Sequence, residues 1–254
     1  MCTLSLFKSD HSLIVTINRD ESRQRHEAGI KEQKVSNTNI IFPIDGLSGG
    51  TWFGINDSGV VMALLNRYQA LHVSNPITRG KIIPSCLSMG SYSTIFDHLN
   101  QQNFAEFNPF DLFLICLDGC HQFTWDGQQT AIKQIDESAF QFSSSGVDTA
   151  EILEKRQRCF NQILDDQQKT IWQPSEILEA IHLNQDPIDQ SSSVLMDRPL
   201  VHSKSICQVQ LTTKHNQLNY YPETSLNAWR NNNSSVARLP RQQHKLTLNP
   251  ITQQ

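Results

Sequence analysis

Cysteine stands at position 2 of the chain, directly after the initiator methionine. Methionine aminopeptidases usually remove Met1 before a small residue, and the mature chain would then begin with Cys2. One residue would carry both a thiol and a free α-amine, whose pKa of roughly 7.7–8.0 lets it take the thiol proton near neutral pH. A base beside a weak nucleophile is the general arrangement for covalent catalysis. Taken alone, position 2 is equally compatible with a cysteine that has no catalytic role.

Three further side chains have the chemistry to assist such a thiol. A carboxylate at Asp20 would accept a hydrogen bond from the α-amine, and a guanidinium at Arg19 would lower the pKa of the thiol. The amide N–H of Asn66 would stabilise the oxyanion of a tetrahedral intermediate. Each residue also has a structural alternative. Arg19 would instead form an ion pair with Glu21 or Asp10. Asp20 would serve as a turn or capping residue, and Asn66 would cap a hairpin.

Length and charge exclude several functions. The chain has 254 residues, a net charge of -4 and no long basic run, which argues against binding of nucleic acid. Lys8, Asp10 and Arg19 interrupt the apolar residues at the N-terminus, so this segment is not a secretory signal. Elsewhere no apolar run approaches the roughly 20 residues that a membrane helix requires. We therefore expect a cytoplasmic protein without a membrane span.

The cysteines and histidines indicate neither disulfides nor a metal site. Six cysteines are scattered through the chain without an export signal, so reduced thiols are expected. Cys116 and Cys120 form the nearest pair, but no second pair supplies the four ligands of a zinc site. There is no Gly-x-Gly-x-x-Gly motif and no P-loop. We expect no metal and no cofactor, and the sequence does not indicate an oligomeric state.

The elements that must position these residues start at the N-terminus. Residues 2–7 and 12–18 alternate polar and apolar side chains around a turn, which predicts a hairpin. Residues 22–40 are polar and weakly periodic, as expected for a surface loop. The run Asn56-Asp57-Ser58-Gly59 lies between two β-rich segments and predicts a second hairpin.

Helices and strands then alternate in blocks. Apolar spacing predicts a helix over 85–101, a second over 148–166 and a shorter one from Pro174. Strands are expected at 111–117, 121–125, 130–135, 191–197, 202–212 and 217–221. Blocks of strands separated from blocks of helices favour an α+β fold with antiparallel sheets. We expect one domain over 1–224 and a poorly ordered, polar tail over 225–254.

The alternation of side chains along a strand constrains the candidate site. If the second strand stays regular through residue 20, Asn18 and Asp20 share one face and Arg19 points to the other. The three side chains then cannot all meet Cys2. A strand end or a bulge, which commonly re-aims side chains beside active sites, would bring them together.

Four sequence features in order carry a family resemblance. They are Cys2 at the start of a strand, Asn18-Arg19-Asp20-Glu21 at the end of the next, Gly49-Gly50-Thr51-Trp52-Phe53-Gly54-Ile55-Asn56, and Gly59 followed by Leu64-Leu65-Asn66-Arg67. Together they resemble the NRDE-motif family, also called the Transport and Golgi organisation 2 family. The resemblance covers the first 67 residues, and 143–145 and 193–198 are weaker echoes of bacterial members.

This family looks like a branch of the N-terminal nucleophile hydrolases of the Cys type. The resemblance implies a four-layer αββα sandwich, with two antiparallel sheets packed face to face between helices. It also implies Cys2 as nucleophile, Arg19 and Asp20 as its neighbours, and Asn66 as oxyanion donor. In the related amidases the arginine precedes the aspartate by three positions, whereas here the two residues are adjacent.

Three more residues are candidates for substrate binding. Trp52 would line an acyl pocket, although an aromatic residue on an internal strand is more often part of the core. Asn18 ends the second strand beside the catalytic candidates. The resemblance implies a late arginine near the site, for which Arg198 is the nearest candidate and Lys204 the other.

Two functions fit these residues. The first is an amidohydrolase that cleaves a linear small-molecule amide through an acyl-Cys2 intermediate. The second is a non-catalytic carrier or trafficking factor for a haem-like or lipid metabolite, in which Cys2 would be an axial ligand. Since a fold does not decide activity, the sequence leaves open whether the protein is an enzyme.

Overall fold

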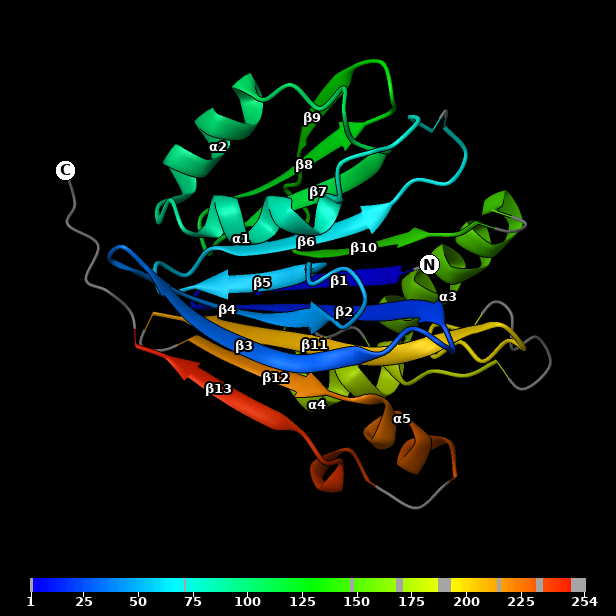
Figure 1. Cartoon of the computed structure of the whole chain (residues 1–254). Helices are drawn as coiled ribbons and strands as arrows, with labels where there is room; N and C mark the ends of the chain where they lie inside the picture. The colour runs from blue at the N-terminus through cyan, green and yellow to red at the C-terminus, as the bar shows by residue number, and fades with distance from the viewer. Residues whose placement is uncertain are drawn as a thin grey trace.

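A computed structural model describes residues 2–70, 72–146, 149–167, 171–186, 193–213, 216–231 and 235–247. The described strands form two antiparallel sheets (Figure 1). The six-stranded sheet has the order β10 (Ala139–Ser144), β1 (Cys2–Ser9), β2 (Ser12–Ser22), β11 (Val201–Thr212), β12 (Asn216–Tyr221), β13 (Gln242–Leu246). The seven-stranded sheet has the order β3 (Glu27–Val35), β4 (Thr38–Asp45), β5 (Phe53–Asn56), β6 (Val61–Asn66), β7 (Phe110–Ile115), β8 (Cys120–Trp125), β9 (Thr130–Gln134).

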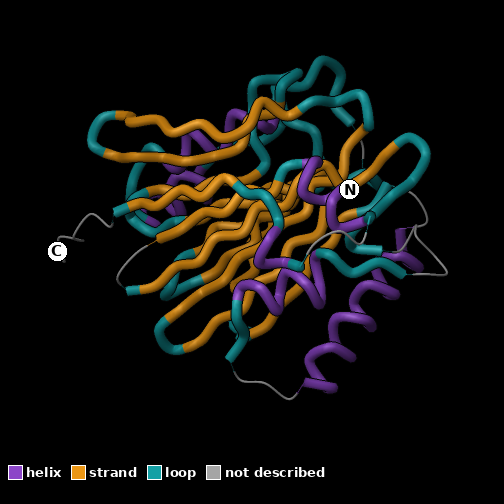
Figure 2. The backbone as a smooth tube through the Cα atoms, turned by 90° about the horizontal axis from the view of Figure 1, so that it is seen from below, coloured by secondary structure: helices purple, strands orange, loops and turns teal. Residues whose placement is uncertain are grey.

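Helices cover the outer face of each sheet. The seven-stranded sheet carries α1 (Ile82–Leu87) and α2 (Tyr92–Gln101), with the short η1 (Arg79–Lys81) ahead of them. The six-stranded sheet carries α3 (Thr149–Gln167), α4 (Pro174–Ile177) with the π-helical turn η2 (Leu178–His182), α5 (Glu223–Arg230) and η3 (Val236–Arg238). Figure 2 shows helices lying across one face of the strands. The fold is thus the expected α+β sandwich with two antiparallel sheets.

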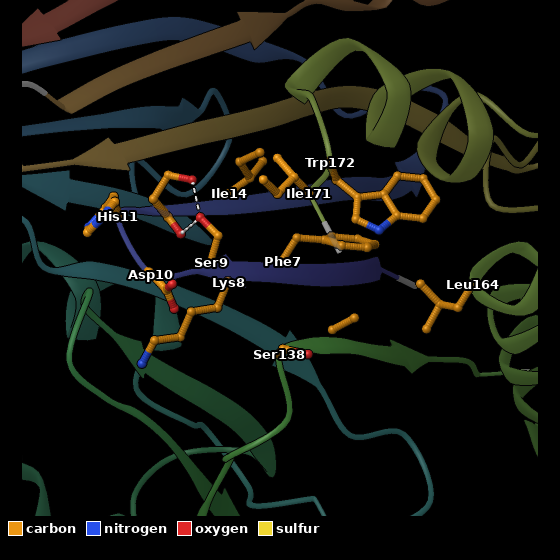
Figure 3. Close-up of a pocket in the computed structure, with 12 residues that line it drawn as sticks. Phe7, Lys8, Ser9, Asp10, His11, Ile14, Ser138, Leu164, Ile171 and Trp172 are labelled. Atoms are coloured by element: carbon orange, nitrogen blue, oxygen red, sulfur yellow. Dashed lines mark hydrogen bonds between the residues drawn. The ribbon is translucent and has the colours of Figure 1, made fainter. Parts of the chain in front are cut away.

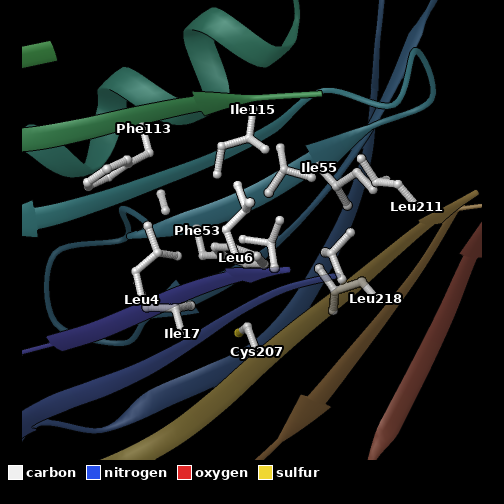
Figure 4. Close-up of a cluster of buried hydrophobic side chains, with 14 of the residues drawn as sticks. Leu4, Leu6, Ile17, Phe53, Ile55, Phe113, Ile115, Cys207, Leu211 and Leu218 are labelled. Carbon is white, nitrogen blue, oxygen red and sulfur yellow. The ribbon is translucent and has the colours of Figure 1, made fainter. Parts of the chain in front are cut away.

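The main core fills the space between the two sheets. Strand alternation sends Leu4, Leu6 and Ile17 inward, where they join Phe53 and Phe113 of the facing sheet (Figure 4). All five side chains are fully or almost fully buried. Burial of each large apolar side chain stabilises the fold by roughly 1.5–3 kcal/mol. This packing fixes the position of β1, and therefore of the cysteine at its start.

A second buried layer lies beneath the helices of the six-stranded sheet, and it combines two apolar clusters with a polar part. The side chains of β1 and β2 that alternate away from the core include Thr3, Ser5 and Asn18, all with no exposed surface. They hydrogen-bond to groups from the helices and from the segment before β11. Because buried polar groups are costly unless paired, these bonds fix how the helices sit on the sheet.

The structure corrects several sequence-based expectations. Residues 22–40 are not a loop, because β3 and β4 form a long hairpin there; β3 is an edge strand whose side chains are mostly polar and partly exposed, which hid its alternation. The helix expected over 85–101 is two helices, separated at Gly90, whose φ of 86° ends the first; Ser91 then caps the second by accepting a hydrogen bond from Thr94 N–H. Another strand, β10, was not predicted.

The C-terminal part also differs from its expected form. Residues 193–197 form no strand beyond a single bridge between Asp197 and His202, and 191–192 lie outside the described residues. The expected boundary at 224 falls inside α5, and β13 pairs with β12 within the segment expected to be a tail. Residues 248–254 lie outside the described residues. Among those described, no helix is long and apolar enough to cross a membrane.

Candidate functional site

A small cleft opens where the start of β1 meets the end of β6. It has a volume of about 130 Å³, and its lining includes Cys2, Arg19, Asp20, Trp52 and Asn66. Cys2 pairs directly opposite Arg19 in the β1–β2 ladder, so the two side chains share the face that points toward the other sheet. The structure thus brings the four catalytic candidates and Trp52 to one place.

Cys2 is held through its backbone N–H, which donates to the Ser144 hydroxyl at 3.2 Å on the neighbouring strand β10. Burial raises the pKa of the Cys2 thiol, and the nearby Asp20 charge adds to the rise. The positive charge of the chain's amino group opposes the rise most, and that of Arg19 opposes it less. Within the described chain, the thiol therefore rests in its protonated form near neutral pH.

Arg19 is a buried cation with its charge already compensated. It donates to Glu27 at 2.9 Å and to Asp45, and Glu21 lies 3.6 Å away. Its guanidinium lies 4.4 Å from the centroid of the Trp52 ring, in cation–π geometry. The structural alternative for Arg19, an ion pair with Glu21, is thus present as its longest contact, whereas the closer partners Glu27 and Asp45 were not predicted.

Asp20 points to the opposite face of β2, as strand alternation requires. Its Oδ1 accepts a hydrogen bond of 2.6 Å from the Ser203 hydroxyl. Burial raises the pKa of Asp20, while the positive charge of Arg156 and the Ser203 bond oppose that rise. The expected bulge exists, but in β11 and not in β2: Ser203 pairs with Asp20 and Ser205 with Arg19, which leaves Lys204 as the extra residue. The bulge aims Ser203 at Asp20.

Asn66 and Tyr68 both line the cleft. Burial raises the pKa of Tyr68 to about 12, and the neighbouring Asn66 amide opposes the rise. Tyr68 therefore stays protonated at physiological pH, beside the proposed oxyanion donor.

Two predicted site residues lie away from the cleft. Asn18 is completely buried on the helix side of the sheet, where its Nδ2 donates to the carbonyl oxygens of His182 and Val194. Arg198 does not line the cleft; its backbone carbonyl accepts hydrogen bonds from Arg23. Asn18 faces away from Cys2 because β2 has no bulge that would turn its side chain toward the cleft. Neither Asn18 nor Arg198 is therefore placed to contact a substrate beside Cys2. The alternative late cation, Lys204, pairs with Glu223 at 2.6 Å, outside the cleft.

Sequence reasoning missed several residues of the cleft, among them Arg25, Asp45, Tyr68 and Arg79. Arg25 lies in the segment that we expected to be a surface loop, and Asp45 ends the unpredicted strand β4. Arg79 follows a stretch without periodicity. For Tyr68 a signal was available, since a residue two positions after Asn66 falls on the same side of an extended chain.

A larger cavity lies elsewhere. With a volume of about 620 Å³, it opens at the other end of β1, around the β1–β2 turn (Figure 3). Its lining includes Phe7 and Trp172, whose tilted rings have centroids 5.1 Å apart, and Asp10 and His11. It contains none of the candidate catalytic residues.

Among the described residues, no three His, Cys, Asp or Glu side chains converge as metal ligands.

A family comparison shows the family of the chain, and solved structures share its fold. The family model described as Transport and Golgi organisation 2 matches residues 1–227. A search of curated proteins gave no match.

Three solved structures illustrate the likeness. The N-acylethanolamine-hydrolyzing acid amidase ortholog of Caenorhabditis elegans is 10% identical at a TM-score of 0.58, covering 82% of this chain and 92% of that one. A mutant of conjugated bile acid hydrolase from Clostridium perfringens is 9% identical at a TM-score of 0.55, covering 99% and 100%. Penicillin V acylase from Agrobacterium tumefaciens is 11% identical at a TM-score of 0.52, covering 87% and 83%. At such identities the likeness is one of fold.

Proposed function

The chain belongs to the Transport and Golgi organisation 2 family, and from this premise we propose that it cleaves a linear amide through an acyl-Cys2 intermediate once Met1 is removed. The observation that carries the proposal is the convergence of Cys2, Asp20 and Asn66 on one cleft. The descriptions of the similar structures, an amidase, a hydrolase and an acylase, support the reaction class.

The first half of the reaction forms a thioester. After processing, the Cys2 nitrogen that donates to Ser144 would be an α-amine, and it would take the proton from the thiol. The thiolate attacks the amide carbonyl carbon and forms a C–S bond. Asn66 donates to the oxygen that becomes negative. When the intermediate collapses, the C–N bond breaks and the leaving amine takes the proton from the α-ammonium group.

The second half regenerates the thiol. The same α-amine takes a proton from a water molecule, whose oxygen adds to the thioester carbonyl carbon. The C–S bond then breaks, the carboxylic acid is released, and the α-ammonium group returns the proton to the Cys2 sulfur. Asp20 keeps the α-amine oriented throughout, because the hydrogen bond from Ser203 and the charge of Arg156 hold its carboxylate in place.

We also propose that the reaction occurs in the cytoplasm. In support, all six cysteines, which lie among the described residues, are free thiols.

A carrier is the second candidate, and one observation favours it. The charge of Arg19 is compensated by Glu27 and Asp45, so this guanidinium gives a Cys2 thiolate less help than an unpaired one would. The charged lining fits the polar head of a lipid metabolite better than a haem ring, which requires an apolar pocket.

The test uses processed protein whose loss of Met1 is verified by intact mass. Hydrolysis of a panel of N-acyl p-nitroanilides is measured for the wild type and for Cys2→Ala, Cys2→Ser, Asn66→Ala and Cys159→Ala. We expect no turnover in Cys2→Ala, a trace in Cys2→Ser, and a kcat lowered by roughly 10²–10³ in Asn66→Ala. Cys159 is exposed on α3, so its replacement is the matched thiol control.

The same experiment distinguishes the two candidates. Mass spectrometry of the quenched reaction should find the acyl group on the Cys2 peptide. Undiminished activity in Cys2→Ala would exclude the proposed nucleophile. Absence of hydrolysis by processed wild-type protein over the whole panel would favour the carrier.

A further inference from the structure

Arg79 differs from the other two arginines of the cleft in its partners. Arg19 pairs with Glu27 and Asp45, and Arg25 pairs with Asp45 at 2.7 Å and Glu21 at 3.2 Å. Among the described residues, no carboxylate lies within ion-pair distance of Arg79. Its one hydrogen bond there runs from Nη1 to the carbonyl oxygen of Pro109, at 2.6 Å. A guanidinium has five N–H donors, so most of this fork is available to a ligand.

The position of Arg79 is fixed by its backbone. The loop that carries it packs against the glycine motif before β5, and the Thr51 N–H donates to the Gly80 carbonyl at 3.0 Å. A Cβ added to Gly50 would lie 2.7 Å from the Gly80 Cα, so only glycines allow this approach. The Pro109 carbonyl that holds Arg79 also accepts from the N–H of Arg67 at 3.2 Å, next to Asn66. Arg79 and the residue next to Asn66 are therefore anchored to one carbonyl.

The surroundings favour an anion at this point. Arg79 and Thr78 line the same cleft as Cys2, and burial, followed by the charge of Arg25, lowers the pKa of Arg79, partly offset by Tyr68. A partly buried guanidinium without a counter-charge is unfavourable, so a ligand that supplies the charge gains affinity. Arginine binds carboxylate and phosphate through two parallel hydrogen bonds.

We propose that Arg79 binds an anionic group of the substrate, so that the substrate is an acid in which a carboxylate or phosphate lies close to the scissile amide. Arg79, Cys2 and Asn66 all line one small cleft. A substrate whose amide lies at Cys2 would therefore bring its anionic group to Arg79 within the same cleft. That the substrate is an amide rests on the proposed function, whereas the recognition of an anion rests on Arg79 alone.

Binding is tested separately from catalysis by using Cys2→Ala protein. Glutaramate, the monoamide of glutaric acid, and its methyl ester are titrated in a calorimeter; the two probes differ only in the carboxylate charge. We expect the acid to bind at least about tenfold more tightly than the ester. Arg79→Gln should abolish this difference, and Arg79→Lys, which keeps the charge but not the fork, should retain part of it.

Lys81 supplies the matched control. It is exposed, lies two residues from Arg79 and does not line the cleft. Lys81→Gln removes the same charge and should leave the preference for the acid unchanged. Thermal denaturation confirms that each variant is folded. Phosphonate and carboxylate probes of equal length then show which of the two anions the site prefers.

Each outcome bears on a different claim. Equal affinity for acid and ester, no measurable binding of the acid, or an Arg79→Gln variant that behaves like Lys81→Gln would overturn the role of Arg79. A charge preference that depends on Arg79, in a protein that hydrolyses no amide when processed, would support anion recognition and refute the hydrolase.

Discussion

At the scale of single residues, the position of Arg19 beside Cys2 follows from the local sequence, whereas its charged partners do not. The β1–β2 hairpin places Arg19 opposite Cys2, as a regular ladder requires. Its main partners, Glu27 and Asp45, come from β3 and β4, which local sequence does not reveal. The ion pairs of Arg19 with these two carboxylates therefore hold the side chains beside Cys2 in place without a ligand.

His182 shows how fully the polar layer behind the site is specified. Its Nδ1 lies 2.5 Å from Asn18 Oδ1 and its Nε2 lies 2.6 Å from the Ser5 hydroxyl. Both N–H groups of the Asn18 amide are donated to carbonyls, so Oδ1 must accept, and His182 therefore carries its proton on Nδ1. Burial lowers the pKa of His182 and so favours the neutral ring, in which Nε2 accepts from the Ser5 hydroxyl.

We predict that His182 makes stability fall in mild acid. Burial lowers the pKa of His182 from its ordinary 6.5 to about 3. Between these values the unfolded chain binds a proton that the folded chain does not, so the free energy of unfolding rises with pH. The contribution is complete above about pH 6.5 and is lost as the pH falls toward 3. Urea unfolding of the wild type and of His182→Gln over this range measures it.

The control is His98→Gln, on the exposed side of α2. The difference in unfolding free energy between the wild type and His182→Gln should shrink as the pH falls, whereas His98→Gln should follow the wild type. A pH-independent difference for His182→Gln would show that the histidine is not buried as a neutral ring.

At the scale of elements, the sequence predicts what local patterns encode. Alternation and turn residues predict the β1–β2 hairpin, the β5–β6 hairpin and β7 to β9, so Cys2, Arg19 and Asn66 are placed correctly on their strands. Contacts between distant segments have no local signal. Ser144 reaches Cys2, and Ser203 reaches Asp20, through strands paired from far along the chain. The β11 bulge that aims Ser203 is visible only in the register.

We predict that Gly50→Ala destabilises the protein by about 1–3 kcal/mol. The new Cβ would lie 2.7 Å from the Gly80 backbone, so the two loops must separate. Gly119→Ala is the control, because its nearest obstacle is the Tyr92 hydroxyl at 3.3 Å, a side-chain atom that can move. Urea unfolding should therefore show a clear loss for Gly50→Ala and little change for Gly119→Ala. Equal losses would show that the contact between glycines is not what matters.

At the scale of the whole molecule, the C-terminal segment is part of the fold. Leu226, Val236 and Leu239 are buried in one cluster with Ile206 of β11 and Tyr221 of β12. Trp229 of α5 donates to the Leu183 carbonyl at 3.1 Å. A polar, asparagine-rich composition concealed this packing, because it rests on a few apolar residues among the described ones, Leu226, Trp229, Val236 and Leu239.

We predict that a chain ending at residue 224 is destabilised by more than about 3 kcal/mol, since it loses several large buried side chains. A chain ending at 247, which keeps every described element, is the matched control. Thermal and urea unfolding of the two chains beside the full-length protein decide the matter. If the shorter chain unfolds like the full-length protein, the domain ends at 224 after all.

The order of strands in the six-stranded sheet has a consequence for synthesis of the protein. The strand that carries Cys2 is made first, yet its neighbour β2 pairs with β11, where Asn18 lies opposite Ile206. Translation at about 5–20 residues per second separates these two strands by roughly 10–40 s. Throughout that interval the six-stranded sheet lacks β11, β12 and β13, so it cannot yet enclose the start of β1. The amino-terminus is therefore open to enzymes that act on nascent chains before the cleft exists.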